Sequence, residues 1–190
     1  HATLATAYVI KSILKYHLNQ INFNTMSGKL KVTRKDNFYF LDFPSRKPHS
    51  SLLPKEIELS LNIQPKEVFK SRDYMLVYDT QQEIEKIEIN RSYFDQINLG
   101  HGGVIVTAKG NKSDLVSRYF TPQATILEDA VTGSAHCTLI PFWSSRLLKN
   151  KLEALQISKR GGKLICWDML DRVIIGGEAK IYSKGEFILS

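Results

Sequence analysis

The sequence shows one order of features twice, at an offset of 133 or 134 residues, and this repeat limits the possible folds most strongly. The opening segment HATLATAYVIKSIL has apolar residues at helical spacing, and a strand, a GKL turn at 28–30 and a further strand follow it. The later segment SAHCTLIPFWSSRLL is followed by the same series, with its GKL turn at 162–164. We interpret the pair as an internal duplication, in which His1 corresponds to Ser134.

The rest of the chain has the pattern of short strands and short helices. Apolar and polar residues alternate on both sides of Ser27-Gly28, which predicts a hairpin. The polar, basic stretch at 45–51 is typical of a linker or surface loop. Further strands are expected over 38–43, 74–78, 103–108, 116–120, 156–158, 163–167 and 172–175, helices over 53–61 and 81–88, and a terminal hairpin over 179–189.

Composition excludes several classes of protein. The net charge is +7, but the basic residues are scattered over turns and strand ends, so nucleic-acid binding is not expected. No run approaches the roughly 18 apolar residues that a membrane-spanning helix needs. Two cysteines, Cys137 and Cys166, are too few for a disulfide framework and indicate a reducing compartment.

The stretch EDAVTGSAHC at 128–137 is the richest in residue types that active sites use. A serine hydrolase is excluded, because Thr132 and His136 stand where the nucleophile motif G-x-S-x-G requires glycine. A zinc site is not expected either, because adjacent His136 and Cys137 lack the spacing of metal ligands. We interpret Cys137 as a small core residue and His136 as a surface or interface residue.

An anion-binding helix start fits this stretch better. Gly133 allows a close backbone approach, Ser134 is a good capping type, and their N–H groups would point at a bound carboxylate or phosphate. Asp129 could face the same spot as a proton acceptor or hydrogen-bond partner, or it could merely cap the turn. The site requires a helix that begins near Ser134 and continues through Pro141, whereas a helix that begins at Pro141 would remove it.

The run EDAVTGSAHCTLIPFW, with QISKRGGKL and DRVIIGGEAKI after it, resembles the phenazine-biosynthesis (PhzF-like) family of the diaminopimelate epimerase-like fold. HATLATA at the start, GGVIVTAKG and SRYFTP fit the same family, so the resemblance covers essentially the whole chain. Ala130 departs from the family's usual proline after the Glu-Asp pair. The resemblance implies an α+β fold with two similar lobes, each a central helix wrapped by bent antiparallel or mixed sheet, and a ligand cleft between them.

The resemblance also implies a function. It implies isomerisation by proton transfer on a small carboxylate-bearing molecule, without cofactor or metal, in cytoplasmic homodimers. On the matching positions, His1 corresponds to the histidine of the family's Gly-His-Ala/Pro-Thr motif and Asp129 to the cleft aspartate, so these are the candidate catalytic residues. Gly133 and Ser134 correspond to the carboxylate-binding helix start and are the candidate substrate-binding residues.

The resemblance further places the family's general acid/base glutamate before His1. We therefore expect an N-terminal lobe over 1–60, truncated at its start, and a C-terminal lobe over 61–190, whose last strand at about 180–190 could return to the first lobe. Glu128 does not occupy the matching position, so the 190 residues alone are expected to be inactive as an isomerase. The alternative is a non-enzymatic metabolite-binding or interaction protein with the same fold.

Overall fold

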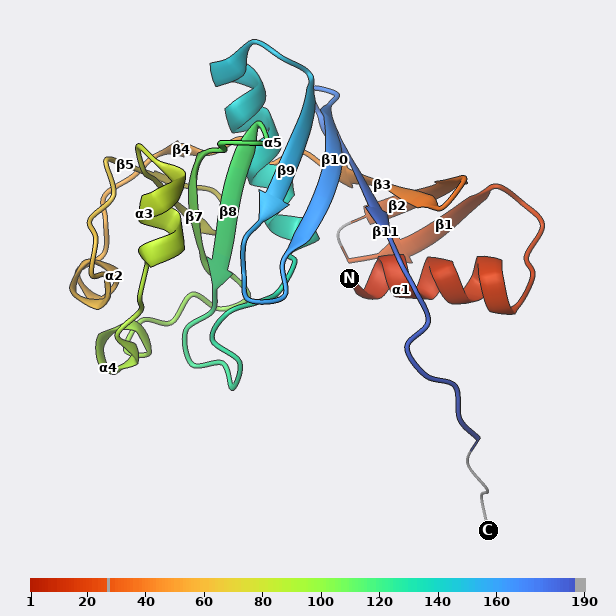
Figure 1. Cartoon of the computed structure of the whole chain (residues 1–190), viewed down its shortest axis with the longest axis horizontal. Helices are drawn as coiled ribbons and strands as arrows, with labels where there is room; N and C mark the ends of the chain where they lie inside the picture. The colour runs from red at the N-terminus through yellow and green to blue at the C-terminus, as the bar shows by residue number, and fades with distance from the viewer. Residues whose placement is uncertain (27, 187–190) are drawn as a thin grey trace.

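Eleven strands form one continuous sheet across residues 1–26 and 28–186, which the computed structural model describes (Figure 1). The strands are β1 (Gln20–Thr25), β2 (Gly28–Lys35), β3 (Phe38–Pro44), β4 (His49–Ser50), β5 (Glu67–Lys70), β6 (Tyr74–Val77), β7 (Val104–Lys109), β8 (Leu115–Phe120), β9 (Lys151–Gln156), β10 (Gly162–Asp168) and β11 (Arg172–Glu178). The helices are α1 (Ala2–Tyr8), continued by the π-helical turn η1 (Val9–Ile13), α2 (Lys55–Ser60), α3 (Gln81–Lys86), α4 (Arg91–Phe94) and α5 (Gly133–Leu147). The sheet order is β1-β2-β3-β11-β10-β9-β8-β7-β6-β5-β4, antiparallel except for the parallel pairs β6–β7 and β8–β9.

The repeat in the sequence is visible in this topology. Three antiparallel strands, β1 to β3, follow α1, and three more, β9 to β11, follow α5. The strands β2 and β10 begin at Gly28 and Gly162, and β3 and β11 begin at Phe38 and Arg172, so both pairs are 134 residues apart. The two units meet edge to edge, because β3 pairs with β11 over its whole length.

The largest apolar core surrounds α5. The helix continues through Pro141, and all residues from Ala135 to Ser144 are buried. Six successive strands, β6 to β11, direct side chains at it, so the sheet must curve around the helix. Trp143 adds a polar anchor, because its Nε1 donates to Oγ1 of Thr107 at 3.0 Å. The expected central helix that begins near Ser134 is thus confirmed, and each fully buried Leu or Ile in this core contributes about 1.5–3 kcal/mol.

The opposite face of the sheet carries a second core. Side chains alternate between faces along a strand, so Ile105 of β7 faces α5 while Val104 and Val106 face the second cluster. The helices α3 and α4 cover this cluster at one end of the molecule (Figure 1). Ile57 of α2 also lies in it, so α2 packs with these helices. The lobe limits of 1–60 and 61–190 remain a prediction.

The core next to α1 is small. Ala7 is the one residue of α1 that is fully buried, and it packs with Val32, Tyr39 and Leu41 from β2 and β3. The helix lies against the β1–β3 end of the sheet (Figure 1). Leu14, just beyond η1, is 69% exposed, so this end of the chain contributes little apolar burial.

Some expected elements are wrong. Residues 179–186 form no strand and extend away from the sheet (Figure 1), while the rest of the hairpin expected over 179–189 lies outside the described residues. At this end of the chain the sheet pairing stops with Glu178 of β11, which lies opposite Phe38 of β3. The strand expected over 156–158 instead spans Lys151–Gln156, and β5 and α4 were not expected. Within the described residues, no helix is long and apolar enough to cross a membrane.

Candidate active site

The starts of α1 and α5 open on one cavity of about 890 Å³. The residues that line this cavity include His1, Thr3, Asp129, Gly133 and Ser134. The structure therefore brings together all four candidate site residues, as the duplication and the resemblance led us to expect. That these residues bind or convert a substrate remains a prediction.

The start of α5 is equipped for an anion. Thr132 is the N-cap, but its side chain caps no helical N–H, and the amides of Gly133 and Ser134 precede the first turn of helical hydrogen bonds. Two such amides and the dipole of a helix favour a negative group, by roughly 0.3–2 kcal/mol. A methyl group at Gly133 would meet nothing within 4 Å, so the Cα of this residue faces open space.

Asp129 has two roles in the structure. Its Oδ2 accepts a hydrogen bond from Oγ1 of Thr132 at 2.6 Å, so it does hold the turn before α5. Its backbone N–H donates to the oxygen of Tyr119 at 3.0 Å, which ties the loop to β8. Asp129 also lines the cavity, so capping the turn does not exclude a place at the site, and its part in proton transfer remains a prediction.

Gln156 supports this loop from β9. It is buried, and its Oε1 accepts the N–H of Thr132 at 2.7 Å. Its Nε2 donates to the backbone oxygen of Asp129 at 2.8 Å and to Oγ1 of Thr132 at 3.2 Å. A single amide side chain therefore fixes both ends of the turn that carries Asp129 to the helix start. Sequence reasoning assigned no role to Gln156, although it is the first residue of the QISKRGGKL run.

A buried acid and its partners form the far wall of the site. The carboxylate of Asp73 is fully buried and accepts hydrogen bonds from the N–H of Gly103 and the hydroxyl of Tyr119, both at 2.9 Å. Arg72 pairs with it, with Nη2 at 2.9 Å from Oδ2, and the same Nη2 donates to Oγ of Ser134 at 3.0 Å. Arg72, Tyr119 and Ser134 all line the cavity.

Electrostatics keep this wall in one protonation state. Burial and the charge of Asp73 raise the pKa of Tyr119, so its hydroxyl stays protonated and donates. Burial lowers the pKa of Arg72, but its hydrogen bond and charge interaction with Asp73 raise it by more, so the guanidinium stays cationic. Sequence reasoning missed Arg72 as well, although a charged Arg72-Asp73 pair directly before an apolar strand was a usable signal.

His136 is not the surface or interface residue that we expected, since it is fully buried. Its Nδ1 lies 2.8 Å from the carbonyl oxygen of Thr132, which can only accept, so Nδ1 carries the proton. Burial lowers the pKa of His136 to about 4, although the bond to Thr132 opposes this, so the ring is neutral at pH 7. The imidazole ring therefore stabilises the loop through its hydrogen bond to the backbone of Thr132.

The other polar groups of the stretch also have structural partners. Cys137 is buried in the core, as expected, and burial raises the pKa of its thiol to about 11. Glu128 forms an ion pair with Arg118, whose Nε lies 2.7 Å from Oε1 of Glu128. Among the described residues, no group of three or more His, Cys, Asp or Glu side chains could hold a metal.

Comparisons with known proteins agree over the whole chain. The family model described as phenazine biosynthesis-like protein matches residues 1–185. An uncharacterized isomerase of Pseudomonas aeruginosa is 41% identical over 100% of this chain and 72% of its own length, and one of Halalkalibacterium halodurans is 39% identical with the same coverage. The crystal structure of a PhzF-family phenazine biosynthesis protein from Enterococcus faecalis is similar, with a TM-score of 0.91 and 43% identity over 100% of this chain and 72% of that one. The α+β fold expected from the resemblance is thereby confirmed.

Proposed function

The chain belongs to the phenazine biosynthesis-like protein family, and from this premise we propose that it is an isomerase or epimerase that transfers a proton on a small carboxylate-bearing metabolite. The names of the relatives, uncharacterized isomerases, support the reaction class. The observation that carries the proposal is the convergence of two helix starts, at His1 and at Gly133, on one cavity with Asp129 on its wall.

In this proposal the substrate's carboxylate binds to the amides of Gly133 and Ser134. Thr132 occupies Oδ2 of Asp129, which leaves Oδ1 as the oxygen that can take up or return a proton. His1 faces the same cavity from α1 and would relay or deliver the proton at another atom of the substrate. A positioned acid or base of this kind typically accelerates proton transfer by about 10²–10⁴-fold.

The test is solvent exchange. The protein, expressed from its complete natural gene, is incubated in deuterated water with a panel of small carboxylic acids, and deuterium incorporation is followed by NMR. We expect incorporation at one carbon of the substrate, and a loss of about 10²-fold or more in Asp129→Asn. His49→Gln is the control, because His49 is exposed and does not line the cavity.

Two results would contradict the proposal. Carboxylates that bind in the cavity without any exchange would favour the non-enzymatic, metabolite-binding alternative. Exchange that is equally fast in Asp129→Asn would remove Asp129 from the mechanism.

The expected homodimer and its cytoplasmic location belong to the same proposal, and light scattering of the purified protein tests the expected homodimer.

A further inference from the structure

Arg72 is held in one orientation at the wall of the cavity. Its Nε and Nη2 both point at the buried Asp73, whose remaining acceptor capacity is used by Gly103 and Tyr119. The guanidinium therefore cannot rotate without leaving the charge of a buried carboxylate unpaired. Its side chain is 30% exposed, so part of it still faces the cavity.

The contact with Ser134 orients a hydroxyl. A guanidinium only donates, so Oγ of Ser134 must accept the hydrogen bond from Nη2 of Arg72. The hydroxyl's own hydrogen then points elsewhere and is available to a ligand in the cavity. Ser134 thus offers an N–H and an O–H on the same side, next to the remaining N–H groups of Arg72.

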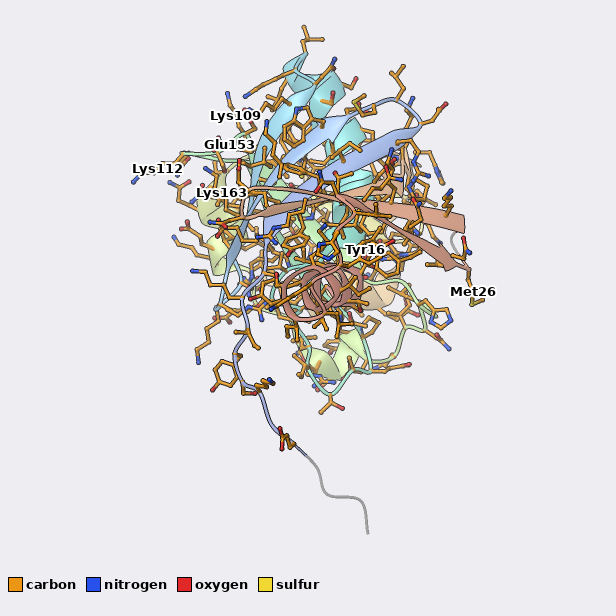
Figure 2. All side chains as sticks on the ribbon, turned by 90° about the vertical axis from the view of Figure 1, so that its right-hand side faces the viewer. Tyr16, Met26, Lys109, Lys112, Glu153 and Lys163 are labelled. Carbon is orange, nitrogen blue, oxygen red and sulfur yellow. The ribbon has the colours of Figure 1, made fainter. Side chains whose placement is uncertain are left out.

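The other cationic side chains at the cavity are not held by a buried partner. The ammonium of Lys163 pairs with Glu153 at 2.7 Å on the neighbouring strand, where the two lie side by side in Figure 2. Arg160 is an exposed residue in a loop. Of the cavity's cations in the described part of the chain, Arg72 is therefore the one that is both partly buried and fixed.

We propose that Arg72 determines specificity, by making the cavity select an ionised carboxylate over a neutral group of the same shape. The carboxylate would accept from the amides at the start of α5, from the hydroxyl of Ser134 and from Nη1 of Arg72. The inference rests on the carboxylate-binding step of the proposed function, but it does not depend on proton transfer. Because Asp73 balances the charge of Arg72, selection depends on the direction of these N–H groups and not on net charge.

The experiment compares benzoate with benzamide by NMR titration. The two probes have the same shape and differ in charge, and their ring suits the apolar wall near Leu4, Phe43 and Leu164. Hydrogen bonds to a charged group are worth about 1.5–3 kcal/mol, so we expect benzoate to bind about 10–150-fold more tightly than benzamide. A defect in folding alone would weaken both probes equally and leave their ratio unchanged.

Two variants separate geometry from stability. Arg72→Lys keeps the positive charge but loses the fixed N–H directions of the planar guanidinium. The double variant Arg72→Met, Asp73→Asn leaves no unpaired buried charge. We expect the benzoate preference to fall to about threefold or less in both, since charge without direction does not suffice. Arg146→Met is the matched control, because Arg146 pairs with Glu67 outside the cavity, and it should keep the wild-type ratio.

The inference is overturned if both Arg72 variants keep the wild-type preference, or if the wild-type protein does not distinguish the two probes. Its failure differs from failure of the isomerase proposal. A preference that depends on Arg72 without any deuterium exchange supports the inference and contradicts the enzyme. Deuterium exchange in the wild type, together with an unchanged benzoate preference in both Arg72 variants, supports the enzyme and contradicts the inference.

Discussion

Nε2 of Gln156 donates to the backbone oxygen of Asp129 at 2.8 Å, so a buried amide on β9 sets the position of the cavity's aspartate. The same side chain accepts the N–H of Thr132 at 2.7 Å. These bonds link the core strand to the helix start through one residue. The hydrogen bonds from Gln156 thus stabilise the loop from the side of the core, while Asp129 and Thr132 of the same loop line the cavity.

Replacement of Gln156 by alanine should therefore affect both stability and binding. The change leaves the buried N–H of Thr132 without an acceptor, so the free energy of unfolding should fall by about 1–3 kcal/mol. Urea denaturation measures this loss, and benzoate titration should show weaker binding because the turn at Asp129 loosens. The control Gln82→Ala, at an exposed residue of α3, should change neither quantity. Unchanged benzoate binding in Gln156→Ala would mean that the loop at Asp129 keeps its conformation without Gln156.

His136 should make the protein less stable in mild acid. Its pKa is about 4 in the folded protein and about 6.5 in the unfolded chain, so between these values the unfolded state binds a proton that the folded state excludes. Stability is complete above pH 6.5 and falls as the pH drops towards 4, by about 3 kcal/mol in all at about 1.4 kcal/mol per pKa unit.

The measurement compares urea denaturation at pH 7 and pH 5. His136→Gln does not titrate, so it should lose about 2 kcal/mol less than the wild type between these values. His49→Gln removes an exposed histidine and should behave like the wild type. Equal losses in the wild type and in His136→Gln would show that the buried ring is protonated by some local opening.

Two glycines of the cavity should respond oppositely to alanine. A Cβ at Gly133 would meet nothing within 4 Å, so Gly133→Ala should fold with unchanged stability but add a methyl group beside the amides that we propose bind the carboxylate. A Cβ at Gly162 would lie 2.4 Å from Cγ2 of Val131, so Gly162→Ala should cost about 1–3 kcal/mol and displace the loop.

Thermal unfolding and benzoate titration distinguish the two glycine variants. Weaker benzoate binding at normal stability is expected for Gly133→Ala, and loss of both for Gly162→Ala. If Gly133→Ala binds benzoate as well as the wild type does, the carboxylate does not sit at the start of α5.

The α1 end of the molecule should open more readily than the rest. Ala7 is the single fully buried residue of α1, whereas ten residues of α5 are buried. Local opening requires little free energy where few apolar contacts are lost. Hydrogen exchange should therefore be faster in residues 1–43 than in 103–178, and equal protection of both regions would contradict this.

The sequence revealed the elements whose pattern is local. The repeat of the opening helical segment in SAHCTLIPFWSSRLL pointed to α5, and the contiguous stretch from Asp129 to Ser134 pointed to the site. Arg72 and Gln156 escaped, because their contacts with Ser134 and with the loop at 129–132 join residues far apart in the chain and leave no periodic pattern. His136 was misjudged since a polar residue type does not reveal that Thr132 offers a buried acceptor. The terminal hairpin failed because a local residue pattern does not show whether a segment finds a strand to pair with.

The pairing of β3 with β11 has a consequence for biosynthesis. Residues 38–44 leave the ribosome early, yet their partners at 172–178 are made 134 residues later. At 5–20 residues per second, β3 waits on the order of ten seconds for its second neighbour, with an open hydrogen-bonding edge meanwhile. An unpaired edge of this kind is a site of aggregation. A pause in translation between these strands should therefore lower the yield of folded protein, although it changes nothing in the finished structure.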